Sequence, residues 1–210
     1  MRSPALARIA PFALFIAFVA MPHGPWLTAL RGVAVAAMLA FLWPRYTELR
    51  AAKAIPTREW LIAVAVGFAV FLVWIHLDHP WIAFDSGPGF DPRRADGGID
   101  WALAGLRLFG LALVVPVMEE LFWRSLVMRW IDARDFLAAD PRRASWGAFV
   151  ISSALFASEH TLWAAGLLAG LGYSWVYKRS GNLWMPIVSH TITNGTLGIW
   201  ILATGNWRFW

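Results

Sequence analysis

The chain has 210 residues, of which 59% are hydrophobic and 15% are charged, and its mean hydropathy is +0.56. This composition is typical of a membrane protein and excludes an ordinary soluble domain. The formal net charge is +5, but the basic residues lie in short loops between apolar runs, where they orient a chain in the bilayer, so nucleic acid is set aside as a partner. Because the chain has no cysteine, any chemistry must come from carboxylate, imidazole, amide or hydroxyl groups.

Apolar runs long enough to cross a bilayer, or nearly so, follow one another along the chain. Tryptophans stand at or near most of their ends, where an indole ring can lie at the level of the lipid headgroups. We therefore predict an all-α fold, a polytopic membrane helix bundle of seven transmembrane helices that forms one integral-membrane domain over residues 1–210. The runs are 9–21, 27–43, 60–77, 101–118, 146–158, 162–177 and 183–203.

Basic residues are enriched in alternate loops, which predicts the orientation. Segments 45–58 and 129–143 are rich in arginine, whereas loop 78–100 has more acids than bases. The positive-inside rule then predicts a cytoplasmic N-terminus and an outer C-terminus. We expect the membrane to be a bacterial inner membrane. Loop 78–100 or segment 132–143 would add an eighth helix if either re-entered the bilayer. The charge inside the fourth run, Arg107, is expected to snorkel outward.

The first run also has the features of a signal peptide, since Arg2 and Arg8 precede a short apolar stretch at 9–21. No small-x-small cleavage site follows it, which favours a retained membrane anchor.

Polar residues of three predicted helices fall at a similar depth. If residues 101–131 form one long helix, Glu119 lies roughly 18 Å from its cytoplasmic end, at ~1.5 Å per residue. By the same measure His160 lies roughly 21 Å deep, and His190 and Asn194 roughly 10 to 16 Å deep. The sequence therefore predicts that these side chains meet in a cavity between helices.

Each of these polar groups also has a purely structural interpretation. Glu120 and Arg124 are four residues apart, so they share a helix face and are expected to form an ion pair. Glu119 is turned ~100° away from Glu120 and is left without that partner. A histidine alone is more often a helix-helix contact. Together, however, a carboxylate, two imidazoles and a carboxamide supply a base and hydrogen-bond donors, which the addition of water to an amide requires.

The same residues resemble the motifs of a known family, the CPBP intramembrane proteases, which include the CAAX prenyl endoproteases and bacteriocin-processing proteins. The resemblance covers the motif-bearing half, residues 101–203, and extends to the exosortase-associated, CAAX-protease-related subgroup. The matching stretches are "EELFWR" (Glu119, Glu120, Arg124) for E-E-x-x-x-R, "FASEH" (Phe156, His160) for F-x-x-x-H, and "HTITN" (His190, Asn194) for H-x-x-x-N.

The resemblance implies an intramembrane endopeptidase that cleaves a membrane-associated protein or peptide. Glu119 and His160 would activate the water, and His190 and Asn194 would hold the oxyanion. The supporting residues would be Glu120, Arg124 and Phe156.

Family members are often described as metalloproteases, but the chain has no H-E-x-x-H sequence. We favour a metal-free mechanism without a cofactor. Zinc is the alternative, and its ligands would be Glu119, His160 and His190.

Two other classes of function fit part of the pattern. In a proton-coupled transporter, Glu119 and His160 would relay protons, although the outer halves of the predicted helices hold few polar groups besides Arg107. A catalytically silent immunity or scaffold protein of the same fold would keep the residues without the activity. The sequence does not identify the substrate, the cleavage site or the oligomeric state.

Overall fold

The computed structural model describes residues 3–21, 24–50, 54–84 and 89–210, and these form an all-α bundle. The confirmed fold class is that of a helical membrane protein. The described segments contain a single isolated β-bridge, between Arg93 and Ile99, and no strand. The helices outside residues 101–132 are α1 (Pro4–Val19), α2 (Pro25–Leu42), α3 (Thr47–Arg50), α4 (Thr57–His76), α8 (Trp146–Ser158), α9 (Trp163–Ser180) and α10 (Trp184–Thr204).

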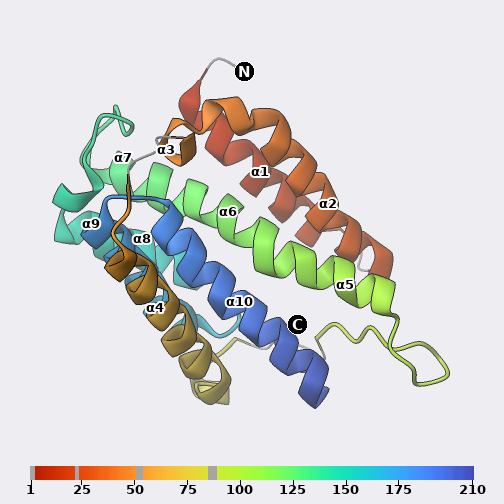
Figure 1. Ribbon diagram of the computed structural model, residues 1–210. Helices are drawn as coiled ribbons and strands as arrows, with labels where there is room; N and C mark the ends of the chain where they lie inside the picture. The colour runs from red at the N-terminus through yellow and green to blue at the C-terminus, as the bar shows by residue number, and fades with distance from the viewer. Residues whose placement is uncertain (1–2, 22–23, 51–53, 85–88) are drawn as a thin grey trace.

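One continuous helical stretch, Trp101–Asp132, forms the centre of the bundle. It consists of α5 (Trp101–Phe109), α6 (Val115–Glu119) and α7 (Arg129–Asp132), joined by two π-helical segments. The π segments are Gly110–Val114 and Glu120–Met128, where the turns are wider than in an α-helix. In Figure 1 this stretch runs between the α1–α2 pair on one side and α4, α8, α9 and α10 on the other.

The positions of the helices agree with the apolar runs of the sequence. However, fewer than seven helical stretches qualify as membrane spans. Among the described residues, three helical stretches are long and apolar enough to cross a bilayer, namely Pro25–Arg45, Thr57–His76 and Trp101–Asp132. Helices α1 and α8 are apolar but shorter. At ~1.5 Å per residue, the 13 residues of α8 cover only about two thirds of a ~30 Å hydrocarbon core. The predicted count of seven spans is therefore higher than length and composition support.

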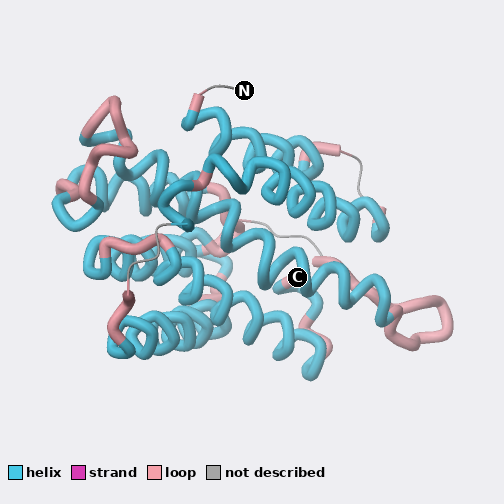
Figure 2. The backbone as a smooth tube through the Cα atoms, turned by 45° about the horizontal axis from the view of Figure 1, so that its top comes forward, coloured by secondary structure: helices cyan, strands magenta, loops and turns pink. Residues whose placement is uncertain are grey.

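No additional α-helix appears in the described parts of the two segments that could have re-entered the bilayer. Loop 78–100 contains a 3₁₀ turn at Pro80–Ile82, and residues 85–88 lie outside the described part. Segment 132–143 contains a 3₁₀ turn at Pro141–Arg143. The tube in Figure 2 shows both as loops that connect the helices.

Helix α1 is attached to the central stretch by polar and aromatic contacts. Arg8 is completely buried, and its Nε–H donates to Glu48 Oε1 (2.9 Å) and to Ser125 Oγ (3.2 Å). Phe12 stacks on Phe122 with ring centroids 4.0 Å apart. Burial opposes ionisation of Glu48, but Arg8 and the Ser125 hydroxyl hold the pKa of this carboxyl below its ordinary value. These contacts connect α1 to α3 and to the central stretch.

Helix α10 reaches its place because α4 approaches it closely. A Cβ added at Gly67 would lie 2.5 Å from the Ser189 carbonyl oxygen, so only glycine allows this approach. The Thr193 hydroxyl donates to the Gly67 carbonyl at 2.8 Å. This contact fixes the part of α10 that carries His190 and Asn194.

The orientation derived from the basic loops gives a direct test of the topology. Arg50 and Arg93 are both exposed, and the positive-inside rule assigns them to opposite sides of the membrane. Cysteines introduced singly at these positions should react with an impermeant thiol reagent from opposite sides of sealed vesicles. The natural chain has no cysteine, so it serves as the unlabelled control. Labelling of both positions from the same side would show that the orientation is wrong.

Candidate active site

The two adjacent glutamates of the central stretch point to different surroundings. Glu120 is fully buried and lies 3.2 Å from Arg124, as oxygen Oε2 to nitrogen Nε, which is the ion pair predicted from their spacing. Glu119 is 5% exposed and lines a cavity. Its Oε2 is buried and has no hydrogen-bond partner among the described residues. The Glu120 carboxylate is therefore neutralised by an ion pair within the bundle, whereas the Glu119 carboxylate faces the cavity.

Arg124 connects the central stretch to two further helices. Its Nη2–H donates to the Gly170 carbonyl on α9 at 3.1 Å. Its guanidinium carbon lies 4.4 Å from the ring centre of Phe156 on α8 and 5.5 Å from that of Tyr173 on α9. A side chain at Gly170 would collide with the backbone of Ser153 on α8, with 2.9 Å from its Cβ to the carbonyl oxygen. The close contact of α8 and α9 thus brings the Gly170 carbonyl within reach of the arginine.

His190 of α10 is positioned by Glu120. Its Nδ1 lies 3.0 Å from Glu120 Oε1, and its ring stacks on Tyr173 at 4.8 Å between centroids. The other nitrogen, Nε2, lies 3.9 Å from Glu119 Oε2. Glu120 therefore holds both Arg124 and His190, and the ring of His190 presents Nε2 to the cavity.

His160 lies just beyond the end of α8, in the turn that leads to α9. Its Nδ1 lies 2.8 Å from the Phe156 carbonyl oxygen, one helical turn earlier. A carbonyl oxygen can only accept, so Nδ1 carries the proton and Nε2 is left with a lone pair. The Phe156 ring packs 4.5 Å from the imidazole, between centroids. His160 can therefore accept a hydrogen bond from a water molecule in the cavity.

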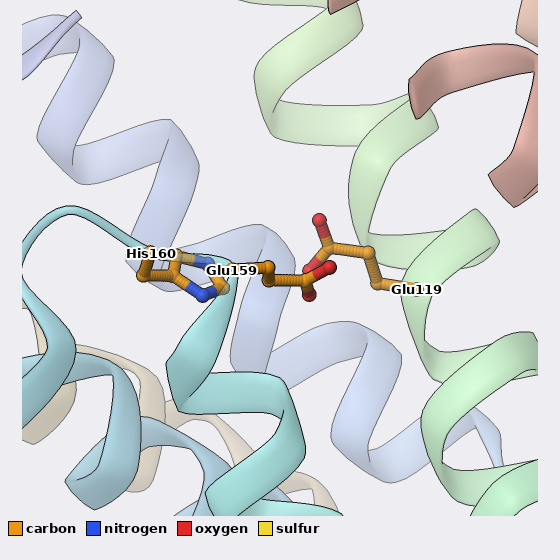
Figure 3. A group of neighbouring side chains, drawn as sticks. All are labelled: Glu119, Glu159 and His160. Carbon is orange, nitrogen blue, oxygen red and sulfur yellow. The ribbon is translucent and has the colours of Figure 1, made fainter. Parts of the chain in front are cut away.

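Glu159 also lies at the site, although we predicted no role for it from the sequence. One ligand atom from each of Glu119, Glu159 and His160 lies within 4.8 Å of the others. Figure 3 shows the Glu119 and Glu159 carboxylates pointing toward one another, with His160 beside Glu159. The Trp123 indole donates to Glu159 Oε1 at 2.8 Å and holds this carboxylate in place.

Asn194 lines the same cavity, and its side chain is hydrogen-bonded to a backbone carbonyl of the central stretch. Its Nδ2–H donates to the Leu111 carbonyl at 2.9 Å. An amide nitrogen carries two hydrogens, so one donor is used by this bond and one is left.

A single cavity of about 280 Å³ contains the predicted catalytic residues. Its other walls are formed by α1, α2 and α5, and they include Arg31 and Arg107. The side chain of Arg107 lines this cavity and lies over Phe90 of loop 78–100, and its outward snorkelling stays a prediction. The four residues expected to carry the chemistry, Glu119, His160, His190 and Asn194, all line the cavity.

The zinc alternative can be compared with the groups that the structure brings together. The ligand set expected from the sequence was Glu119, His160 and His190. In the structure Glu159, and not His190, completes the group of possible ligands. Two carboxylates and one imidazole are suitable ligands for Zn²⁺, and the unpartnered Glu119 Oε2 is free to coordinate. These three residues therefore fit a divalent cation.

A bundle that gathers buried carboxylates, imidazoles and an amide around one cavity has the groups that the addition of water to an amide requires. Residues 101–196 match the family model described as "Type II CAAX prenyl endopeptidase Rce1-like". The part of the chain that carries all three motifs is therefore similar to the CAAX-type intramembrane proteases. Searches of curated proteins and of solved structures gave no significant match.

Substitution of Arg124, which pairs with Glu120, should affect folding more than substitution of Glu119. Arg124→Ala leaves Glu120 as an uncompensated buried charge, which typically costs ~3 to 5 kcal/mol, so the amount of folded protein should fall. Glu119→Gln removes a carboxylate without a hydrogen bond and should leave the folded amount near that of the wild type. Monodisperse yield in detergent and thermal unfolding measure both. If Glu119→Gln lowers the yield more than Arg124→Ala does, Glu119 has a structural role.

Proposed function

We propose that the protein is an intramembrane endopeptidase that hydrolyses a peptide bond of a membrane-associated protein or peptide. The observation that carries this proposal is the convergence of Glu119, His160, His190 and Asn194 on one cavity from separate parts of the bundle. The match of residues 101–196 to a protease family model supports the reaction class. A transporter would need a polar path across the membrane, whereas these groups gather at one place.

In the proposed mechanism Glu119 is the general base. A water molecule lies between its carboxylate and Nε2 of His160 and attacks the carbonyl carbon of the scissile bond. Glu119 takes the proton of this water and later passes it to the leaving amine. Because Glu119 has no hydrogen-bond partner among the described residues, its oxygens remain available to the water.

The tetrahedral intermediate carries a negative charge that needs donors. His190 is held by Glu120 with Nε2 toward the cavity, where it stabilises this charge when that nitrogen carries a proton. The second N–H of Asn194 is the other proposed donor, because its first is engaged by Leu111. Such donors act most strongly in a site that excludes bulk water.

The mechanism is proposed without a metal. If the protein uses a divalent cation, Glu119, Glu159 and His160 are the residues that would hold it. The cation would then supply Lewis-acid polarisation of the carbonyl. Cleavage that persists in the presence of a strong chelator is the expected result.

Substitutions in the cavity should separate the roles. Glu119→Gln and His160→Ala should abolish cleavage in a membrane-reconstituted assay, because water then lacks its base or its second acceptor. Asn194→Ala should leave a residual rate, since loss of one oxyanion donor usually lowers kcat by ~10² to 10³. Asp135→Asn, at an exposed carboxylate outside the cavity, is the matched control.

The assay can use a farnesylated peptide and a panel of transmembrane peptides with mass-spectrometric detection of the products. Full cleavage by the Glu119→Gln protein would exclude the proposed mechanism. No cleavage of any substrate by the wild-type protein would favour the catalytically silent alternative.

A further inference from the structure

A second cavity, of about 210 Å³, lies beside the catalytic cavity. Trp74 of α4 and Phe209 line both cavities, so these two side chains form the boundary between them. The Trp74 ring packs edge-on against the imidazole of His160, with 5.4 Å between centroids. Thr161 and Leu162, which follow His160 in the turn after α8, line the second cavity. The two cavities therefore meet at the turn that carries a proposed catalytic residue.

The polar groups of the second cavity are suited to water. Asp78, Thr161 and Arg208 line it. The Trp210 side chain lines it as well, and its Nε1–H is buried and has no hydrogen-bond partner in the described part of the chain. A water molecule takes up about 30 Å³ in the liquid and needs roughly two to four polar partners when it is buried. The second cavity therefore has the room and the hydrogen-bonding groups for several water molecules.

The second cavity lies on the face of the bundle that carries loop 78–100 and segment 205–210, which we call the loop face. Helices α4 and α10 end at the loop face, and the central stretch begins there. Helix α8 starts at the opposite face and has only 13 residues, too few to cross a ~30 Å hydrocarbon core. The loop therefore meets the turn after α8, where the Phe84 N–H donates to the Thr161 carbonyl at 2.7 Å.

The packing of the bundle separates the catalytic cavity from the opposite face. Beyond Glu119, Tyr173 and His190, in the direction of that face, no described residue of their helices lines the cavity. That part of the bundle is instead filled by side chains that are at most 3% exposed, namely Leu121, Met128, Tyr177 and Ile187. This packing favours the entry of water from another side.

A further side of the catalytic cavity faces lipid. Ile16 and Val19 of α1 line the cavity and are also exposed at the surface of the bundle. In a membrane protein such apolar side chains face the hydrocarbon core, which holds almost no water. An opening here suits an apolar segment of a substrate, but it does not supply the water that hydrolysis consumes. The polar second cavity is better suited to supply it.

The position of Phe209 depends on an exposed ion pair. Phe209 ends the short 3₁₀ turn Trp207–Phe209. The guanidinium carbon of the preceding Arg208 lies 4.9 Å from the Phe209 ring centre, and Arg208 also pairs with Asp78, which follows α4. The Arg208 side chain is 56% exposed, and exposed ion pairs are weak. The turn can therefore open locally without unfolding of the helices.

We propose that the second cavity is the site at which water enters on its way to the catalytic cavity, and that Phe209 is the movable residue between the two. The inference rests on the proposed endopeptidase function, because peptide hydrolysis consumes water. When the pair between Arg208 and Asp78 separates, Phe209 moves aside and water passes to Glu119 and His160. When the pair forms again, the ring closes the site against bulk water.

Labelling of introduced cysteines tests this path without requiring cleavage. The natural chain has no cysteine, so each variant reports on one position. Ala169→Cys places a thiol in the wall of the catalytic cavity, and Thr161→Cys places one in the wall of the second cavity. The full chain in lipid nanodiscs is treated with a methanethiosulfonate reagent that carries a trimethylammonium group, and the rate is followed by mass spectrometry. Thr161→Cys should react rapidly and Ala169→Cys slowly.

Opening of the boundary should raise the labelling rate of Ala169→Cys. Phe209→Ala should raise it by about tenfold or more, because the reaction no longer waits for a local opening. Arg208→Gln and Asp78→Asn break the same ion pair, and each should raise the rate by up to about fivefold, as expected for the loss of an exposed pair. These two substitutions change the local charge in opposite directions. A rise in both therefore cannot come from attraction of the cationic reagent.

Two controls distinguish opening of the boundary from other effects. Arg94→Gln breaks an exposed ion pair with Asp96 in loop 78–100, and Arg94 lines neither cavity, so this substitution should leave the rate of Ala169→Cys unchanged. Ala63→Cys, at a buried alanine of α4 outside both cavities, should stay unreactive in the Phe209→Ala protein. If Phe209→Ala does not fold, Phe209→Leu keeps an apolar side chain and should raise the rate by a smaller factor.

Three results would overturn the inference. The first is a labelling rate of Ala169→Cys that does not change when Phe209 is shortened. The second is an equal rise at Ala63→Cys, which would show a general loosening of the bundle. The third is a parent protein in which Ala169→Cys reacts as fast as Thr161→Cys, because Phe209 would then form no barrier.

The water path and the proposed catalysis can fail separately. If labelling responds as expected but no peptide is cleaved, the path is supported and the proposed catalysis is wrong. If peptides are cleaved but labelling of Ala169→Cys does not depend on Phe209, the catalysis is supported and the path is wrong.

Discussion

The buried ion pair between Glu120 and Arg124 is the interaction on which the arrangement of the site depends. Arg124 donates to the Gly170 carbonyl of α9 and lies over the Phe156 ring of α8, while Glu120 holds His190 of α10. One pair of charges thus fixes the central stretch relative to three other helices. A buried ion pair contributes little net stability, but removal of one partner leaves the other as an uncompensated buried charge. The geometry of the cavity therefore depends on polar contacts outside its walls.

This arrangement separates the residues that hold the site from those that face the cavity. Glu120 is engaged by Arg124 and by His190, whereas Glu119 Oε2 has no hydrogen-bond partner among the described residues. Adjacent glutamates can differ in this way because successive helical residues point ~100° apart. A carboxylate that is buried but not neutralised is costly in an apolar environment, which is why such groups are functional candidates.

The helix positions, the ion pair and the shared depth of the site residues could be predicted from the sequence, because they depend on local spacing. Apolar runs gave the positions of the helices, and the four-residue spacing of Glu120 and Arg124 gave their ion pair. A common depth for Glu119, His160, His190 and Asn194 followed from the rise per residue, and the cavity contains all four. The predicted number of spans was too high, in part because α1 and α8 are apolar but shorter than a bilayer requires.

Other features depend on where a helix ends or on which helices touch. Helical geometry would turn Glu159 and His160 away from each other, but α8 ends at Ser158, so both can reach the same cavity. The cavity-lining position of Arg107 depends on contact between α2 and α5, which spacing within one helix does not reveal. The bond from Asn194 to the Leu111 carbonyl likewise joins residues 83 positions apart.

The wide turns at Glu120–Met128 affect how the chain continues into the loop that follows α7. In a π-helical turn each hydrogen bond spans one residue more than in an α-helix, so the segment contains a residue that an α-helix would not accommodate. Beyond it, Arg129 donates to the carbonyls of Leu137 and Ala139 and thereby fastens the following loop. The attachment of this loop therefore depends on how the wide turns direct Arg129, and Arg129 is not among the residues that line the cavity.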